Sequence, residues 1–170
     1  MYETIKKLAF AFVQIVFMAE RASRGQADWG IRRVECGWPG SNWQSRHLVI
    51  GQVKVCLSDI SVEMGGAVYP LGDSPQKELF RKLDQKIGLA GDPYFEFAKS
   101  HLSQDDFAFW LHTKKKLWAE YDSRNGETFA VAVRAPGSGL LVQDGAHRLA
   151  LKSLRGELSC SLSISLWTLK

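Results

Sequence analysis

Two kinds of hydrophobic spacing divide the chain into strands and helices. Apolar residues alternate with serine over 158–166, and weaker alternation recurs over 47–57 and 129–134. Alternation of this kind is typical of strands that bury one face. Residues 58–63 are expected to extend the 47–57 strand up to a Gly-Gly turn, and the apolar run 140–142 adds a short buried strand. The chain is therefore expected to contain a sheet.

Helical spacing of apolar residues predicts five helices around these strands. The expected helices cover about 3–23, 75–87, 92–102, 104–121 and 146–154. The second follows Asp-Ser and opens on proline, and the fourth follows a Ser-Gln-Asp-Asp sequence that resembles a capping box. Glycines after the second and the fifth mark helix ends. Because strands and helices alternate along the chain, the pattern predicts a small α/β domain.

Residues 1–48 differ in character from residues 49–170. The first segment is interpreted as an N-terminal helix followed by a Trp/Arg-rich connector, with room for a short strand at 31–35. The second is interpreted as one domain with a helical insertion at about 89–126. This insertion, rich in Trp and Phe, is open to two interpretations: additional core, or a lid or partner surface over a site. Its Lys114–Lys116 run is interpreted as the solvated rim of a helix.

Lys6 and Lys7 precede an apolar run at 8–19 near the N-terminus. The run is shorter than the ~20 residues that a membrane-spanning helix requires, and no small-x-small cleavage pair follows it. Three interpretations stay open: a helix packed on the domain, peripheral attachment to a membrane surface or a partner protein, and a secretion signal. The packed helix is preferred, and we expect a cytoplasmic protein.

Composition narrows the class of protein. Of the 170 residues, 45% are hydrophobic and 24% are charged, which is typical of a globular domain and excludes disordered or fibrous chains. The net charge of +4 suits phosphate-bearing ligands but is far from that of a polycationic tail. Cys36, Cys56 and Cys160 have no Cys-x-x-Cys spacing, so neither a disulfide framework nor a zinc ribbon is expected.

The stretch 140–156 carries the candidate chemistry, because it places charged residues at a strand-to-helix turn. Gly145 lets the backbone approach a ligand, and the free amides of the next helical turn favour an anion. Arg148 could hold phosphate oxygens with its fork of donors, and His147 could donate a proton or a hydrogen bond. Asp144 is interpreted as a metal-bridging carboxylate, a base or a helix cap. Ordinary roles as a cap, an ion pair and a core histidine stay open for these side chains.

The sequence Asp144-Gly-Ala-His-Arg148, in a strand-turn-helix-strand context, resembles the Asp-Gly-His-His-Arg signature of the ParB/sulfiredoxin superfold. That superfold includes the ParB N-terminal domain, sulfiredoxin and free serine kinases. The resemblance covers about 49–88 and 127–166, and it implies a small α/β domain with a mixed sheet. Ala146 stands where the signature has its first histidine and where sulfiredoxin has its nucleophilic cysteine, so sulfiredoxin activity is not expected.

Resemblance to the kinase branch implies ATP or another nucleotide, with Mg²⁺, and phosphoryl transfer to a small hydroxyl compound or glycan precursor. Glu63 matches an acidic residue that acts on the substrate hydroxyl in those kinases, as a general base must. Asp144 is the candidate Mg²⁺ ligand. The catalytic residues implied are Glu63, Asp144 and His147, and the phosphate-binding residues implied are Gly145, Ala146, His147 and Arg148.

Two further functions stay open beside phosphoryl transfer. One is a non-enzymatic ParB-like module that binds nucleic acid or a protein partner, and the other is a degenerate domain that only scaffolds. DNA recognition is less expected, because the helix-turn-helix segment that ParB-like chains usually add is not seen after the last strand. The tryptophans and arginines of the connector could stack bases or sugars, or cover the core. The sequence has no P-loop and no Gly-x-Ser-x-Gly motif, and its histidines lack metal spacing.

Overall fold

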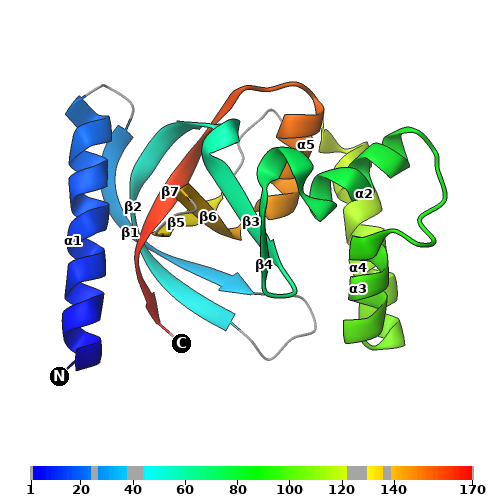
Figure 1. Cartoon of the computed structure of the whole chain (residues 1–170), viewed down its shortest axis with the longest axis horizontal. Helices are drawn as coiled ribbons and strands as arrows, with labels where there is room; N and C mark the ends of the chain where they lie inside the picture. The colour runs from blue at the N-terminus through cyan, green and yellow to red at the C-terminus, as the bar shows by residue number, and fades with distance from the viewer. Residues whose placement is uncertain (1, 24–26, 38–43, 122–129, 136–138, 170) are drawn as a thin grey trace.

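The computed structural model combines helices with a mixed sheet, which confirms the predicted α/β class (Figure 1). It describes residues 2–23, 27–37, 44–121, 130–135 and 139–169, with the backbone alone over 27–37, 44–51, 134–135 and 166–169 and at several positions of 2–21. The helices are α1 (Tyr2–Ser23), α2 (Pro75–Asp84), α3 (Pro93–His101), α4 (Gln104–Ala119) and α5 (Ala146–Leu154). The strands are β1 (Ala27–Gly37), β2 (Gln44–Cys56), β3 (Ile60–Met64), β4 (Ala67–Pro70), β5 (Val131–Ala135), β6 (Gly139–Asp144) and β7 (Ser159–Leu169). Short 3-10 turns, η1 (Leu57–Asp59) and η2 (Leu71–Asp73), precede β3 and α2.

Strands of the described residues form one 7-stranded sheet in the order β1-β2-β7-β5-β6-β3-β4. β7 runs parallel to β5 and β6 runs parallel to β3, while the other neighbouring strands are antiparallel. The strands expected at 140–142 and 158–166 therefore share a sheet, as the predicted domain requires.

The segment expected to be a connector belongs to the sheet. In place of a short strand at 31–35, β1 has 11 residues and pairs antiparallel with β2. Residues 48 and 49, between which the domain boundary is expected, both lie in β2. β1 is an edge strand, where arginine and glycine are tolerated although they made this stretch resemble a loop. The side chains of the connector's tryptophans and arginines lie outside the described residues.

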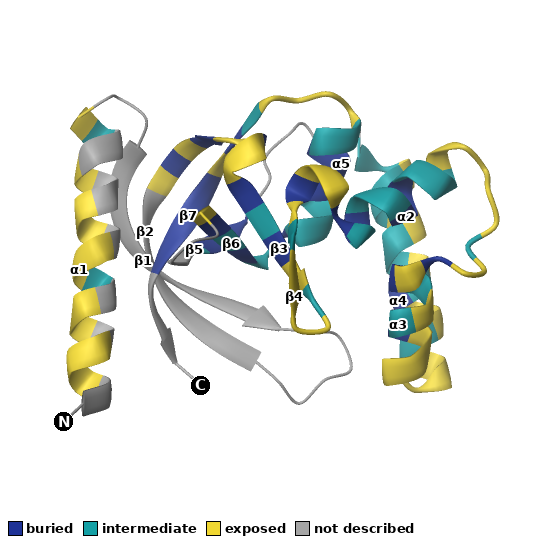
Figure 2. Ribbon diagram, viewed as in Figure 1, coloured by how far each residue is buried: buried dark blue, intermediate teal, exposed yellow. Residues whose placement is uncertain are grey.

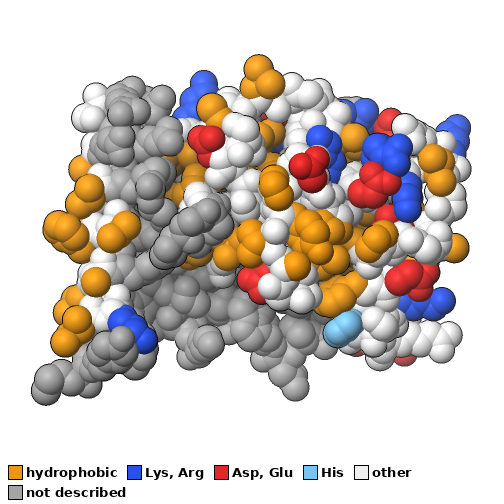
Figure 3. Space-filling model, viewed as in Figure 1, with side chains coloured by type: hydrophobic (Ala, Val, Ile, Leu, Met, Phe, Trp, Pro, Cys, Tyr) orange, Lys and Arg blue, Asp and Glu red, His pale blue; other side chains and the backbone are white. Residues whose placement is uncertain are grey.

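Helix α1 contacts β1, β2 and β7 at the opposite end of the molecule from α2–α5 (Figure 1). This placement agrees with the preferred interpretation of a helix packed on the domain. Its outer side leaves large apolar side chains in solvent, and Leu8 and Phe12 are 61% and 67% exposed (Figures 2 and 3). Within the described residues, no helix combines the length and the apolar character needed to span a bilayer.

Buried side chains form two clusters. The larger lies between the sheet and the helices α2 and α5, and Phe80 belongs to it. The smaller lies among α2, α3 and α4 and contains Leu79, Tyr94 and Trp110. Consecutive residues of α2, Leu79 and Phe80, therefore pack into different clusters and join them. The helical insertion builds a second core, as one of its two interpretations predicts.

The Gly-Gly turn after β3 opens a hairpin that the hydrophobic pattern did not predict. Gly65 and Gly66 have φ values of 59° and 81°, as a two-residue type I′ turn requires. β4 then pairs antiparallel with β3 at the sheet edge. β3 consequently has β4 on one side and β6 on the other, which fixes its place beside the β6–α5 turn.

We expect Gly139→Ala to destabilise the fold by about 2 kcal/mol or more. Gly139 begins β6 at φ +69°, and an added Cβ would lie 2.9 Å from the backbone oxygen of Asp59. The left-handed conformation alone costs a residue with a Cβ about 1–2 kcal/mol, and the clash with fixed backbone adds to it. Urea unfolding followed by circular dichroism measures the loss. Gly88→Ala is the matched control, because Gly88 has open space around it; an equal loss in both variants would contradict this account.

Candidate functional site

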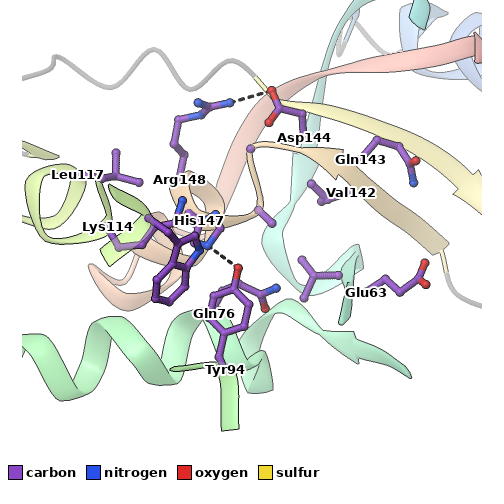
Figure 4. Close-up of a pocket in the computed structure, with 14 residues that line it drawn as sticks. Glu63, Gln76, Tyr94, Lys114, Leu117, Val142, Gln143, Asp144, His147 and Arg148 are labelled. Atoms are coloured by element: carbon purple, nitrogen blue, oxygen red, sulfur yellow. Dashed lines mark hydrogen bonds and ion pairs between the residues drawn. The ribbon is translucent and has the colours of Figure 1, made fainter. Parts of the chain in front are cut away.

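A cavity of about 280 Å³ lies where the two buried clusters meet. Strands β3 and β6 and the first turn of α5 form part of its wall, and α2, α3 and α4 supply the rest (Figure 4). The cavity brings Glu63 together with the whole segment Asp144–Arg148, so every predicted site residue lines it. The other lining residues are Val62, Gln76, Tyr94, Trp110, Lys114, Leu117, Val142 and Gln143.

Gly145 joins β6 to α5 in the left-handed conformation, with φ 89°. Its carbonyl oxygen accepts the first helical hydrogen bond from the backbone nitrogen of Leu149, at 3.0 Å. No side chain of the described residues caps the start of α5, whereas α2, α3 and α4 are capped by Ser74, Asp92 and Ser103. The first-turn amides of α5 are therefore left to the cavity, where they and the helix dipole favour an anion.

Asp144 pairs with Arg148 and does not cap the helix, which removes one of its predicted roles. A terminal nitrogen of Arg148 donates to Asp144 Oδ2 at 3.2 Å. The two side chains are 36% and 37% exposed, so solvent screens the pair and it contributes little to stability. Among the described residues, the buried Nε of Arg148 has no hydrogen-bond partner. Arg148 therefore combines an ordinary ion pair with a buried donor that the described residues leave unpaired.

His147 is held on the cavity wall by aromatic neighbours. Its Nε2 shares a 2.7 Å hydrogen bond with the Tyr94 hydroxyl, and its ring lies edge-on to Phe80 with 6.1 Å between centroids. Burial, followed by the charges of Lys114 and Arg148, lowers the pKa of His147 well below its usual value. His147 is therefore neutral near pH 7 and suited to hydrogen bonding, and not to giving up a proton as an acid.

Tyr94 reaches His147 because α3 begins at a buried cap. Asp92 Oδ1 accepts hydrogen bonds from the backbone nitrogens of Tyr94 and Phe95, each at 3.0 Å. Asp92 Oδ2 lies 3.0 Å from the Nζ of Lys82, an ion pair that ties the start of α3 to α2. Burial raises the pKa of Tyr94 above its usual value, so its hydroxyl stays protonated.

The prediction that Lys114 belongs to a solvated rim is wrong. Its side chain lines the cavity, and its Nζ lies 5.9 Å from the centroid of the Trp110 ring, within cation–π distance. Burial and then the charge of Arg148 lower the pKa of Lys114 to about 8, although Asp144 opposes this shift. Lys115 and Lys116 are exposed as expected. The helical insertion thus contributes a second cation to the site.

Glu63 lines the cavity from β3, but Figure 4 shows its carboxylate directed away from His147 and Asp144. A general base must lie within hydrogen-bond reach of the proton that it takes. The position of Glu63 therefore agrees with the predicted role, while its side chain would have to rotate inward to perform it.

In the described part of the chain, no group of three or more His, Cys, Asp or Glu side chains could hold a metal ion. Mg²⁺ is commonly bound by one or two carboxylates together with phosphate oxygens and water. Asp144, already paired with Arg148, therefore fits Mg²⁺ only in the company of a phosphate ligand.

Sequence reasoning missed five polar or aromatic lining residues: Gln76, Tyr94, Trp110, Lys114 and Gln143. One signal was available, because Trp110 and Lys114 are four positions apart on the same helix and so share a face. The long aliphatic part of a lysine can follow a buried tryptophan while its charge reaches a cavity. No comparable signal marks Gln76 or Tyr94, which arrive through the packing of α2 and α3.

Comparison of the chain with family models, curated proteins and solved structures gave no match. The resemblance to the ParB/sulfiredoxin superfold therefore stays a prediction. An α/β class by itself does not identify an activity, because such folds host many unrelated functions. The function has to be inferred from the geometry of the cavity.

We expect His147→Gln to make the free energy of unfolding depend less steeply on pH in the acidic range. His147 is neutral in the fold because burial lowers its pKa, whereas in the unfolded chain it takes up a proton below about pH 6.5. The unfolded state then binds more protons, so the wild type loses up to about 1.4 kcal/mol per pH unit from this group as the pH falls. Urea unfolding between about pH 7.5 and pH 5 measures the slope. His112→Gln, at an exposed position of α4, should keep the wild-type slope; the same slope in His147→Gln would refute the assignment.

Proposed function

We propose that the cavity binds the phosphate group of a small molecule. The observation that carries this proposal is the convergence of Lys114, Arg148 and the uncapped first turn of α5 on one cavity. Backbone amides and guanidinium groups donate hydrogen bonds to phosphate oxygens, and an ammonium adds a point charge. Together they provide the donors and the positive charge that a dianionic group requires.

The balance of charge at the site also favours an anionic ligand. Arg148 is paired with Asp144, whereas Lys114 forms no ion pair with a carboxylate of the described residues. Burial disfavours the charged form of Lys114, and a phosphate beside it would favour that form. A bound phosphate would therefore add to the partial counter-charge that Asp144 supplies.

A nucleotide is the ligand implied by the resemblance to the kinase branch of the ParB/sulfiredoxin superfold. The cavity of about 280 Å³ is slightly below the range of about 300–1,000 Å³ for pockets that enclose drug-sized ligands. It would hold the phosphates and leave the base near the surface. Mg²⁺ arriving with ATP would be held by Asp144 and the phosphate oxygens, and it would supply charge neutralisation.

A bound nucleotide with Mg²⁺ would support phosphoryl transfer to a small hydroxyl compound. Glu63, on the same cavity, would accept the hydroxyl proton after its side chain rotates inward. Lys114 and Arg148 would stabilise charge on the transferred group, and His147 would orient it by hydrogen bonding. A module that binds nucleotide or a partner without turnover is the alternative, and the outward orientation of Glu63 favours it.

Thermal unfolding with ATP, CTP, ADP and inorganic phosphate, each with and without Mg²⁺, tests the proposal. A ligand at about 100 times its Kd stabilises the fold by about 2.7 kcal/mol, which gives a readily measured increase in Tm. No increase with any of the four would overturn phosphate binding. An increase with ATP but no loss of ATP in the presence of small alcohols would select the non-enzymatic module. Salt-dependent binding to duplex DNA alone would instead support a nucleic-acid module.

We expect the affinity for propyl phosphate to fall as the pH rises from about 7 to about 9. The pKa of Lys114 is about 8, so its ammonium loses its proton in this interval, while a phosphomonoester with a second pKa of about 6 stays dianionic. Lys114→Met should weaken binding by roughly 10-fold at pH 7, or about 1.4 kcal/mol, and remove the pH dependence. Calorimetric titration measures both effects. Lys115→Met removes an exposed ammonium one residue away and should bind like the wild type; equal losses would point to net charge and not to contact.

A further inference from the structure

The outer side of α1 is an exposed apolar surface. Of the ten large apolar side chains that are exposed in the described part of the chain, six lie on this helix: Ile5, Leu8, Phe12, Val13, Ile15 and Val16. Their exposed fractions range from 47% for Ile15 to 67% for Phe12, and Figure 3 shows apolar side chains along the outer side of the helix. Because α1 contacts β1, β2 and β7 with its other side, the core of the protein does not account for this surface.

The apolar residues of α1 have the spacing of a helix that packs against one other helix. Steps of three, four, three and four residues separate Ile5, Leu8, Phe12, Ile15 and Ala19, which is the spacing of the a and d positions in a coiled coil. With 3.6 residues per turn, such steps keep the five side chains on one narrow stripe along most of α1. All five are exposed. A stripe of this width is the surface that a second helix covers.

The stripe is uncharged, and so are the positions that flank it. In coiled coils, the flanking e and g positions often carry charges that select the partner. On α1, the described residues at these positions are Thr4, Ala9, Ala11, Val16 and Ser23. A contact between two copies of one chain has to be complementary to itself. An uncharged apolar stripe meets this requirement, because no like charges oppose each other when it faces its own copy.

A membrane surface fits this side of α1 less well. Helices that lie in a membrane surface carry many basic residues beside their apolar face. Among the side chains of α1 that the structure describes, Lys6 is the only charged one. Attraction to anionic lipid would therefore contribute little to binding.

The area of the surface also suits a pair of copies. Six large apolar side chains that are each about half exposed present on the order of 500 Å². This is near the upper end of the apolar patches that monomers expose. Two such surfaces packed together would bury about 1,000 Å², which reaches the size of a small specific interface.

We infer that the protein forms a symmetric dimer in which the outer side of α1 packs against α1 of a second copy. Leu8 and Phe12, which are 61% and 67% exposed in one copy, would be buried in both copies, and their removal from water would drive the association. Figure 1 shows α1 at the opposite end of the molecule from α2–α5. Each copy would therefore keep its own cavity accessible to a ligand.

Sedimentation equilibrium of the whole chain between about 1 and about 100 µM tests the dimer, because small interfaces bind with micromolar or tighter affinity. We expect the average mass to increase from 19.1 kDa toward twice that value. Leu8→Glu and Phe12→Glu should each raise the dissociation constant at least about 100-fold. Each change removes an apolar contact from both copies and adds two unpaired charges to the contact.

Leu158→Glu is the matched control, because it makes the same change at a side chain that is 84% exposed and lies outside α1. This variant should associate like the wild type. Far-ultraviolet circular dichroism confirms the helix content of each variant, and either of the two α1 variants suffices if the other does not fold.

Variants of opposite charge show whether α1 packs against α1. Phe12 is close to the middle of Tyr2–Ser23, so it faces the middle of the other helix whether the two helices run parallel or antiparallel. Phe12→Lys and Phe12→Glu should each stay monomeric, because like charges meet in the contact. An equimolar mixture of the two should associate at least about tenfold more tightly than either variant alone.

Three results would overturn the inference. The first is a wild type that stays monomeric at the highest concentration; if it then sediments with phosphatidylglycerol vesicles, a membrane surface covers α1 in place of a second copy. The second is a dimer that both Leu8→Glu and Phe12→Glu leave intact, since another surface would then form it. The third is a mixture of Phe12→Lys and Phe12→Glu that associates no more tightly than either variant alone, since α1 would then meet a different part of the second copy.

Discussion

The left-handed turn at Gly145 is the constraint on which the site depends. A residue with a Cβ is disfavoured at φ 89°, and only this turn lets α5 start directly from the end of β6. The direction of α5 places His147 against Tyr94 and aims Arg148 back toward Asp144. The free amides, the neutral imidazole and the guanidinium thus share one geometric origin.

The helical insertion turns this junction into a cavity. Without Tyr94 and Trp110, both from the smaller cluster, the first turn of α5 would lie open beside the sheet. Because Leu79 and Phe80 anchor α2 in both clusters, the distance between the clusters is fixed by a rigid helix.

Local chemistry explains how much could be predicted from the sequence. The serine alternation that became β7, the Ser103 cap of α4 and the Asp-Gly turn before α5 are all determined within a few residues, and the structure has each of them. The cavity residues from the insertion were missed because Tyr94 and Trp110 follow the same helical spacing as ordinary core residues. β1 was underestimated because its pairing with β2, and not its own composition, makes it a strand. The superfold stays a prediction because no comparison gave a match. The activity stays a prediction because the sequence does not show which ligand the cavity binds.

The parallel pairing of β3 with β6 has a consequence for the order of folding. Ile60 lies opposite Leu140, so this pairing closes a long loop that contains α2, α3 and α4. Closing the loop costs conformational entropy before the contacts between the two strands can stabilise the fold. The contacts among those helices are closer in sequence and can form earlier. The cavity is complete only once β6 docks beside β3 and brings α5 against α2. A ligand therefore finds its binding surface only on the finished fold, so its occupancy slows unfolding and leaves the rate of folding nearly unchanged.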